Sequence, residues 1–221
     1  MVAARTLIAV VAALAWLAGA TRAPAEDCVA ITDFSTGKVG EFPPDWKPRK
    51  DSGRAVYSIK EEGGRRFLHA ASQGQGVQAA KEFAWDLNAY PILAWSWRPL
   101  VFPQGSDERK SSANDSVLSV YAVFPHTSWS VKSVKYIWSA MVPVGTRLDS
   151  SKGLTQVRVL RSSAEDKEKW VDERVNVLDD YRAYFKTQDV PKPAGIAVLT
   201  DSDDTKSRAE GDYANFRVCK P

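Results

Sequence analysis

Short apolar or alternating segments, separated by glycine, proline, aspartate and serine, fill residues 55–218 of the sequence. Such segments, rich in β-branched and aromatic residues, are typical of β-strands. We predict ten strands, over residues 55–60, 66–70, 77–83, 92–98, 116–124, 135–141, 154–161, 170–175, 195–200 and 213–218. Glu62-Gly63-Gly64 lies between the first two and indicates a hairpin. This regular spacing of short strands predicts an all-β fold, a single antiparallel β-sandwich.

One short segment shows the periodicity of a helix, near residues 177–186. Asn176 can cap its first turn, with Asp179 three residues on, and Pro191 follows its end. Its apolar residues fall on one face: Val177, Leu178, Tyr181 and Phe185. We therefore expect one helix beside the sandwich.

The amino-terminal residues have the pattern of a secretory signal peptide. Arg5 precedes an apolar stretch over residues 7–20, and Ala23-Pro24-Ala25 matches a cleavage site. We expect residues 1–25 to be removed and residues 26–221 to form one β-sandwich domain, exported to the periplasm or beyond the cell. No later segment is apolar for long enough to span a membrane.

Charge narrows the range of partners. Without residues 1–25 the chain has 28 basic and 27 acidic residues, so its formal charge falls from +3 to +1. A nearly neutral chain with interspersed charges gives no reason to expect nucleic acid as a partner. Cys28 and Cys219 are the two cysteines. In an oxidising compartment they most simply pair with each other, which would bring the first and last strands together.

Residues 195–205, GIAVLTDSDDT, contain the Asp-x-Asp-x-Thr pattern of haloacid-dehalogenase-type phosphatases. Only sixteen residues follow Thr205, too few for the remaining strands and helices of that α/β fold, so we reject this interpretation. Asp201 and Asp203 instead offer oxygen ligands for a structural calcium ion. The alternatives are a turn in which these side chains bond to the backbone, or contact with a polar ligand.

Tryptophans form the second candidate group. Trp95 and Trp97 share one face of a predicted strand, as Tyr136 and Trp138 do on another. Exposed aromatic rings stack on sugar rings, so these residues favour a carbohydrate-binding surface. The alternative is that they form the core of the sandwich. The candidate ligand contacts among the tryptophans are Trp46, Trp97, Trp129 and Trp138.

Arg98 and Asp115 extend the candidate ligand-binding set. In a meander they would face each other near one rim, where a bidentate pair could brace the sheet or orient a ligand. Conventional catalytic motifs are absent from the sequence: neither His69 nor His126 belongs to a zinc motif, and there is no G-x-S-x-G elbow. A pair of glycosidase carboxylates is defined by its separation in space rather than in sequence, so no sequence motif tests for it.

Several of these motifs together resemble the exported bacterial domain-of-unknown-function family numbered 3047, from about Phe34 to Phe216. They are Pro43-Pro44-Asp45-Trp46, Tyr90-Pro91, Trp95-Ser96-Trp97-Arg98, Asn114-Asp115, Tyr136-Ile137-Trp138-Ser139, Gly145-Thr146, Arg174-Val175-Asn176, Asp180-Tyr181 and residues 201–205. One departure is Lys186, where we expect a glycine after Phe185. The resemblance implies a jelly roll of galactose-binding type, akin to carbohydrate-binding modules, with no established activity.

These observations favour an exported, non-catalytic β-sandwich that binds a carbohydrate or another polar component of the cell envelope. One alternative is an envelope glycan hydrolase or lyase that uses acids from the same rim. Another is a structural partner of a second envelope protein, which would need a contiguous apolar patch.

Overall fold

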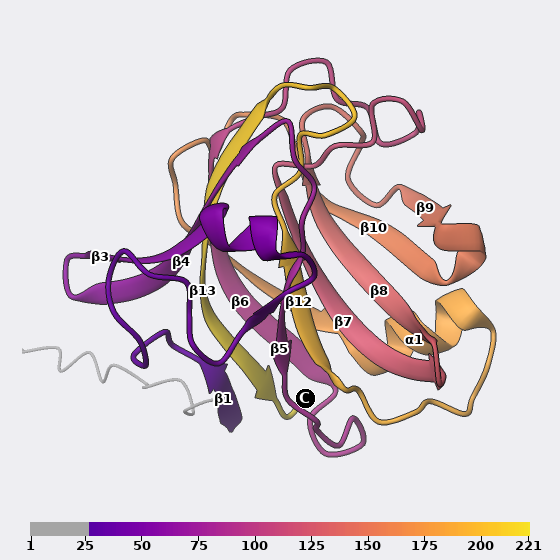
Figure 1. Ribbon diagram of the computed structural model, residues 1–221. Coiled ribbons are helices and arrows are strands. Elements are labelled where there is room, and N and C mark those ends of the chain that lie inside the picture. The colour runs from indigo at the N-terminus through magenta and orange to yellow at the C-terminus, as the bar shows by residue number, and fades with distance from the viewer. Residues whose placement is uncertain (1–26) are drawn as a thin grey trace, which may run out of the picture.

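Two β-sheets packed face to face make up residues 27–221, the part of the chain that the computed structural model describes (Figure 1). The proposed signal peptide, residues 1–25, lies outside this part. The two sheets confirm the predicted β-sandwich of jelly-roll type. Strands adjacent in space are often far apart in sequence.

Sheet A has β1 (Cys28–Thr32) paired with β13 (Arg208–Cys219) at one end of that long strand. Its main path runs in the order β11 (Val171–Asn176), β6 (Ile92–Val101), β13, β4 (Arg65–Gln73) and β3 (Tyr57–Glu62). All its strand pairs are antiparallel.

Sheet B runs in the order β2 (Lys47–Pro48), β5 (Ala79–Glu82), β12 (Gly195–Leu199), β7 (Leu118–Thr127), β8 (Ser130–Ser139), β10 (Thr155–Ser162) and β9 (Arg147–Ser150). The pair β8 and β10 is parallel, and the other pairs in this sheet are antiparallel. The predicted sandwich is therefore antiparallel except at this one pair. Short 3-10 turns occupy Asp51–Ala55 and Ser151–Gly153.

The core lies between the two sheets and is built largely from aromatic residues. Trp95 of β6 contacts Tyr136 of β8, with ring centroids 5.8 Å apart. Trp97 of β6 likewise contacts Trp138 of β8, with ring centroids 5.6 Å apart. Side chains alternate between the two faces of a strand. Tyr136 of β8 points into the core, so its neighbour Lys135 points away from the core.

The local sequence signals for the hairpin and the helix are confirmed. Gly63 and Gly64 join β3 to β4 with φ of 58° and 78°, a conformation that glycine adopts readily. Helix α1 spans Val177–Phe185, and the Asn176 side chain accepts a hydrogen bond from the Asp179 N–H. Lys186 takes the left-handed C-cap position, with φ of 51°, where we expected glycine.

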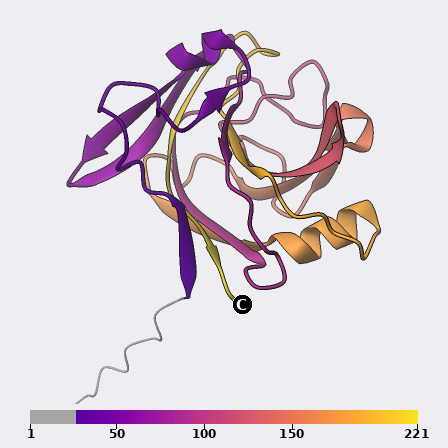
Figure 2. The same cartoon turned by 60° about the horizontal axis from the view of Figure 1, so that its bottom comes forward.

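The two ends of the described chain are joined. Cys28 and Cys219 are register partners in β1 and β13 and form a disulfide, as predicted. Figure 2 shows β1 beside the carboxyl-terminal end of β13. None of the helices within residues 27–221 is long and apolar enough to cross a membrane.

Candidate functional site

A groove of about 990 Å³ lies on the face of sheet B that points away from the core. We call it the sheet B groove. Its floor comes from β7, β8 and β12, which lie side by side in Figure 1. The floor residues are Tyr121, Val123, Ser133, Lys135, Ala197 and Leu199. Further lining residues lie at its edges: Lys47, Arg49, Gln78, Asn114, Trp129, Asp201 and Asp204.

Strand alternation explains why polar side chains reach the groove. On β8, Val134 and Tyr136 belong to the core between the sheets, whereas Ser133 and Lys135 point to the opposite face. On that face Tyr121, Ala197 and Leu199 form a small apolar cluster of their own. The floor thus combines an apolar centre with neighbouring polar groups, the usual composition of a ligand site.

Trp129 stands at the rim of the groove, in the turn that joins β7 to β8. Its side chain is 96% exposed. The Trp129 N–H donates to Thr127 Oγ1 at 3.3 Å, and Thr127 Oγ1 lies 2.6 Å from Ser130 Oγ, so the turn is held by side chains. The turn therefore fixes the Trp129 backbone, and the indole faces solvent.

Lys135 and Asp201 are the buried basic and acidic residues among those that line the groove, with exposures of 7% and 8%. The Lys135 ammonium lies 5.5 Å from the centre of the Tyr121 ring. Burial, together with nearby Asp203 and Asp115, outweighs the attraction of Lys135 and raises the pKa of Asp201 to about 8. Within residues 27–221, Asp201 Oδ1 has no hydrogen-bond partner.

A group of carboxylates lies at the end of the groove that Asp201 and Asp204 line. Asp115, Asp203 and Asp204 each offer an oxygen, and these oxygens lie within 4.8 Å of one another. A side-chain carbon added to Gly76 would lie 2.5 Å from Asp201 Oδ1 and 2.8 Å from Asp203 Oδ1. Glycine therefore allows the backbone to approach both carboxylates closely. Clustered carboxylate oxygens are suitable ligands for Ca²⁺.

Asp115 also organises the turn formed by residues 203–206. It is fully buried and accepts hydrogen bonds from the N–H groups of Asp204 and Thr205, at 3.1 and 2.8 Å. The Thr205 hydroxyl adds a third bond at 2.5 Å. The turn is therefore stabilised by side-chain bonds to the backbone, but the acceptor is Asp115 rather than the Asp201 or Asp203 side chain that the sequence hypothesis named.

Three predicted ligand contacts are core residues instead. Trp46, Trp97 and Trp138 are 0–2% exposed, so their rings have no face available to a ligand. Trp97 and Trp138 pack against each other between the sheets. Trp46 lies against Phe34, with ring centroids 5.7 Å apart. For these three the alternative weighed from the sequence, burial in the core, is correct.

Arg98 and Asp115 do not form the pair that a meander would give. Arg98 lies on β6 of sheet A and donates to Asp212 and Glu62, at 2.8 Å each. Asp115 precedes β7, which belongs to sheet B. The chain crosses from one sheet to the other between them, which separates the two residues. Of the six predicted ligand contacts, Trp129 is the one that lines the sheet B groove.

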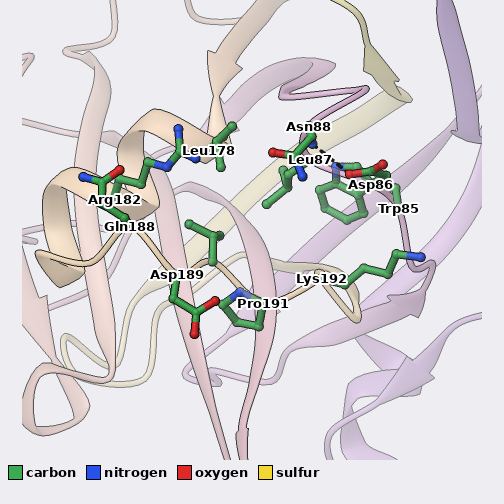
Figure 3. A pocket seen from close by; sticks show the side chains of 11 residues that line it. Trp85, Asp86, Leu87, Asn88, Leu178, Arg182, Gln188, Asp189, Pro191 and Lys192 are labelled. Atoms are coloured by element: carbon green, nitrogen blue, oxygen red, sulfur yellow. Dashed lines mark hydrogen bonds between the residues drawn. The ribbon is translucent and has the colours of Figure 1, made fainter.

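A second, smaller pocket of about 280 Å³ lies beside α1. Figure 3 shows Leu178 and Arg182 of the helix on one side, residues 85–88 on the other, and Asp189 and Pro191 on the segment after the helix. Its tryptophan, Trp85, is 5% exposed and so offers no open ring face. The sheet B groove is larger and has the exposed aromatic residue, so we take it as the candidate site.

Comparison with known proteins gives one family match for the sequence. A family model described as "Protein of unknown function (DUF3047)" matches residues 44–217. No curated protein matches the chain.

Solved structures include several similar β-folds. A family 29 carbohydrate-binding module from Piromyces equi has 6% identity and a TM-score of 0.37, over 89% of this chain and 92% of that one. The xyloglucanase domain of NopAA, an effector from Sinorhizobium fredii, has 12% identity and a TM-score of 0.42, over 85% and 100%. A family 11 xylanase from Neocallimastix patriciarum has 12% identity and a TM-score of 0.34, over 81% and 94%. Likeness at this level does not assign a function.

Proposed function

This chain belongs to the DUF3047 family of proteins of unknown function, and we propose that it is an exported, non-catalytic protein that binds a glycan chain in the sheet B groove. The observation that carries the proposal is Trp129, a tryptophan 96% exposed at the rim of the largest groove described. A large aromatic ring gains little by facing water, and an exposed one marks a contact surface. A flat indole face matches the apolar face of a sugar ring.

The floor of the groove suits a ligand with many hydroxyl groups. Tyr121, Ala197 and Leu199 give an apolar surface, while Ser133, Lys135 and Asp201 provide donors and acceptors. The floor extends over three adjacent strands, β12, β7 and β8, which gives room for a segment of a longer chain. These features support a glycan as the occupant.

The position of the acids supports binding without conversion. Among the described residues, the carboxylates that line the groove are Asp201 and Asp204, which belong to one short segment at one end of it. Canonical glycoside hydrolysis requires two carboxyl groups that flank the bond to be broken. Two acids at the same end favour ligand or metal contact instead.

Export is part of the same proposal. The Cys28–Cys219 disulfide is typical of proteins that reside in oxidising compartments, and residues 1–25 carry the signal-peptide pattern. Fractionation of cells that express the full chain tests this directly. Recovery of the protein in the cytoplasm with residues 1–25 retained would contradict it.

Replacing Trp129 with alanine is expected to weaken glycan binding by about 30-fold, the loss of about 2 kcal/mol that defines a strong interface contact. Trp129→Phe keeps an aromatic face and is expected to retain most of the affinity. The measurement is isothermal titration of the purified, oxidised protein with the glycan that binds best in a panel of neutral and acidic oligosaccharides.

Trp170→Phe is the matched control for this experiment. Trp170 is half-buried and stacks with Arg65 and Arg98 at sheet A, away from the groove. Its replacement should leave glycan binding unchanged. If Trp129→Ala binds every glycan of the panel as tightly as the unmodified protein, the groove assignment is wrong.

We also propose that Ca²⁺ binds the carboxylates of Asp115, Asp203 and Asp204. The support is the close approach of their oxygens together with the buried, unpartnered Asp201 Oδ1 beside Asp203. Calcium at one hundred times its Kd adds about 2.7 kcal/mol of stability. For a chain of this size we expect the melting temperature to rise by about 5–10 °C relative to the protein with chelator.

Asp203→Asn is expected to remove most of this calcium response. Asp149→Asn, at an exposed acid outside the cluster, should keep it. Melting curves recorded with calcium, with magnesium and with chelator make the comparison. An equal rise in both variants would rule out Asp203 as a ligand, and no rise in the unmodified protein would rule out the metal.

A further inference from the structure

Lys135 is an unusual residue for the floor of a groove. It lies near the middle of β8, between β7 and β10, and its exposure is 7%. Among residues 27–221 it has no carboxylate oxygen within 4.0 Å, the limit for an ion pair. Buried lysines are normally paired, because removing an ammonium group from water is costly.

Asp201 and Glu108, the acids that act on Lys135, lie beyond ion-pair distance from it. Glu108 accepts hydrogen bonds from Ser116 at 3.0 Å and Ser139 at 2.6 Å. Asp201 lies beside Asp203 at the end of the groove. The Tyr121 ring, at 5.5 Å, stabilises a cation through its face but does not neutralise it. Lys135 therefore keeps an unpaired positive charge inside a site that is open to ligand.

The charge on Lys135 is retained despite its burial. Burial acts to lower the pKa of Lys135, but Tyr121, Asp201 and Glu108 raise it on balance above its ordinary value. Two more cationic residues, Lys47 and Arg49, line the groove near the β2 edge; Lys47 is paired with Glu82 at 2.6 Å, and Arg49 donates to Gln78 at 3.3 Å. Arg49 thus adds a second cationic group at one edge of the groove.

We propose that the glycan bound in the sheet B groove is acidic, and that the carboxylate of a hexuronate residue pairs with the Lys135 ammonium. This inference rests on the proposed glycan-binding function and names the class of sugar. A ligand carboxylate supplies the missing counter-charge at a position the protein leaves without one. A neutral sugar would bury the ammonium further and leave it unpaired, which is unfavourable.

The test compares acidic oligosaccharides with their carboxyl-reduced counterparts, which have the same ring stereochemistry and linkage but no charge. The probes are hexamers of galacturonate and of mannuronate, titrated calorimetrically into the purified, oxidised protein. At least one acidic hexamer is expected to bind tenfold or more tightly than its reduced form. Equal affinities within both pairs would overturn the inference.

Lys135→Met separates the role of the charge from that of the side-chain volume. It should remove the preference for the acidic hexamer while binding of the reduced form stays within about threefold. Lys132→Met is the matched control, because Lys132 lies on the same strand, 4.8 Å from the Phe185 ring, and does not line the groove. Retention of the acidic preference in Lys135→Met would show that another group reads the carboxylate.

The stability of Lys135→Met gives an independent readout. Because the variant removes an unpaired buried charge, its melting temperature without ligand should equal or exceed that of the unmodified protein. A marked decrease would mean that Lys135 is neutralised within the protein and would overturn the inference without any glycan present.

The outcomes also distinguish this inference from the proposed function. Trp129-dependent binding of neutral and acidic hexamers with equal affinity would leave glycan binding standing and remove the role of Lys135. Absence of binding to every oligosaccharide would remove both. Galacturonate monomer that binds as tightly as its hexamer would assign the site to a small carboxylate rather than to a glycan.

Discussion

Replacing both Cys28 and Cys219 with serine is expected to lower the free energy of unfolding by about 3–5 kcal/mol. The bond joins residues separated by 191 positions, so it restricts almost the whole unfolded chain. The chain-entropy model gives about 5 kcal/mol for a loop of this length, and strain in the folded state subtracts from it. The effect should be pronounced here because β1 pairs with β13 alone among the strands.

Urea unfolding of the oxidised protein, the reduced protein and the double variant measures this effect. Reduced protein and double variant should unfold at the same urea concentration, well below that of the oxidised protein. Lys220→Ala removes an exposed ion pair with Asp27 at the same chain end, and should change stability by less than about 1 kcal/mol. A double variant as stable as the oxidised protein would show that β-sheet pairing alone holds the termini together.

Local sequence signals predicted much of the fold because each one acts within a few residues. The alternation of apolar and polar residues identified the main strands. Gly63 and Gly64 identified the β3–β4 hairpin, and Asn176 identified the start of α1. Three strands were not among the ten predicted: β1, β2 and β9, with five, two and four residues, too short to show a clear period. Two cysteines were enough to predict the pairing of β1 with β13 because they had no other partner.

The site was harder to predict because it depends on which strands become neighbours. Alternation places Trp95 and Trp97 on one face, but the sequence does not say whether that face is core or surface. The floor joins Tyr121, Lys135 and Leu199, which come together only when β12 and β8 flank β7. A lysine beside the apolar run of β8, Lys135, was a usable signal, but it did not show what would lie beside it.

Replacing Trp97 with alanine is expected to lower the free energy of unfolding by about 3–5 kcal/mol, in contrast to the same change at Trp129. Trp97 is fully buried and packs against Trp95 and Trp138, so its removal leaves a large cavity. Its indole N–H also donates to Glu173 at 3.2 Å. Trp129 is 96% exposed, so alanine there should change stability by less than about 0.5 kcal/mol.

Urea unfolding and glycan titration of both variants test two assignments: Trp97 to the core and Trp129 to the ligand site. Trp97→Ala should lose stability, while molecules still folded at the assay temperature bind the glycan with little change. Trp129→Ala should lose affinity and keep its stability. Trp97→Phe retains a ring between the sheets and should fall between the unmodified protein and Trp97→Ala in stability. A Trp97→Ala variant that keeps its stability but loses affinity would place the ligand at the sequence-predicted tryptophan face, because core packing does not predict that combination.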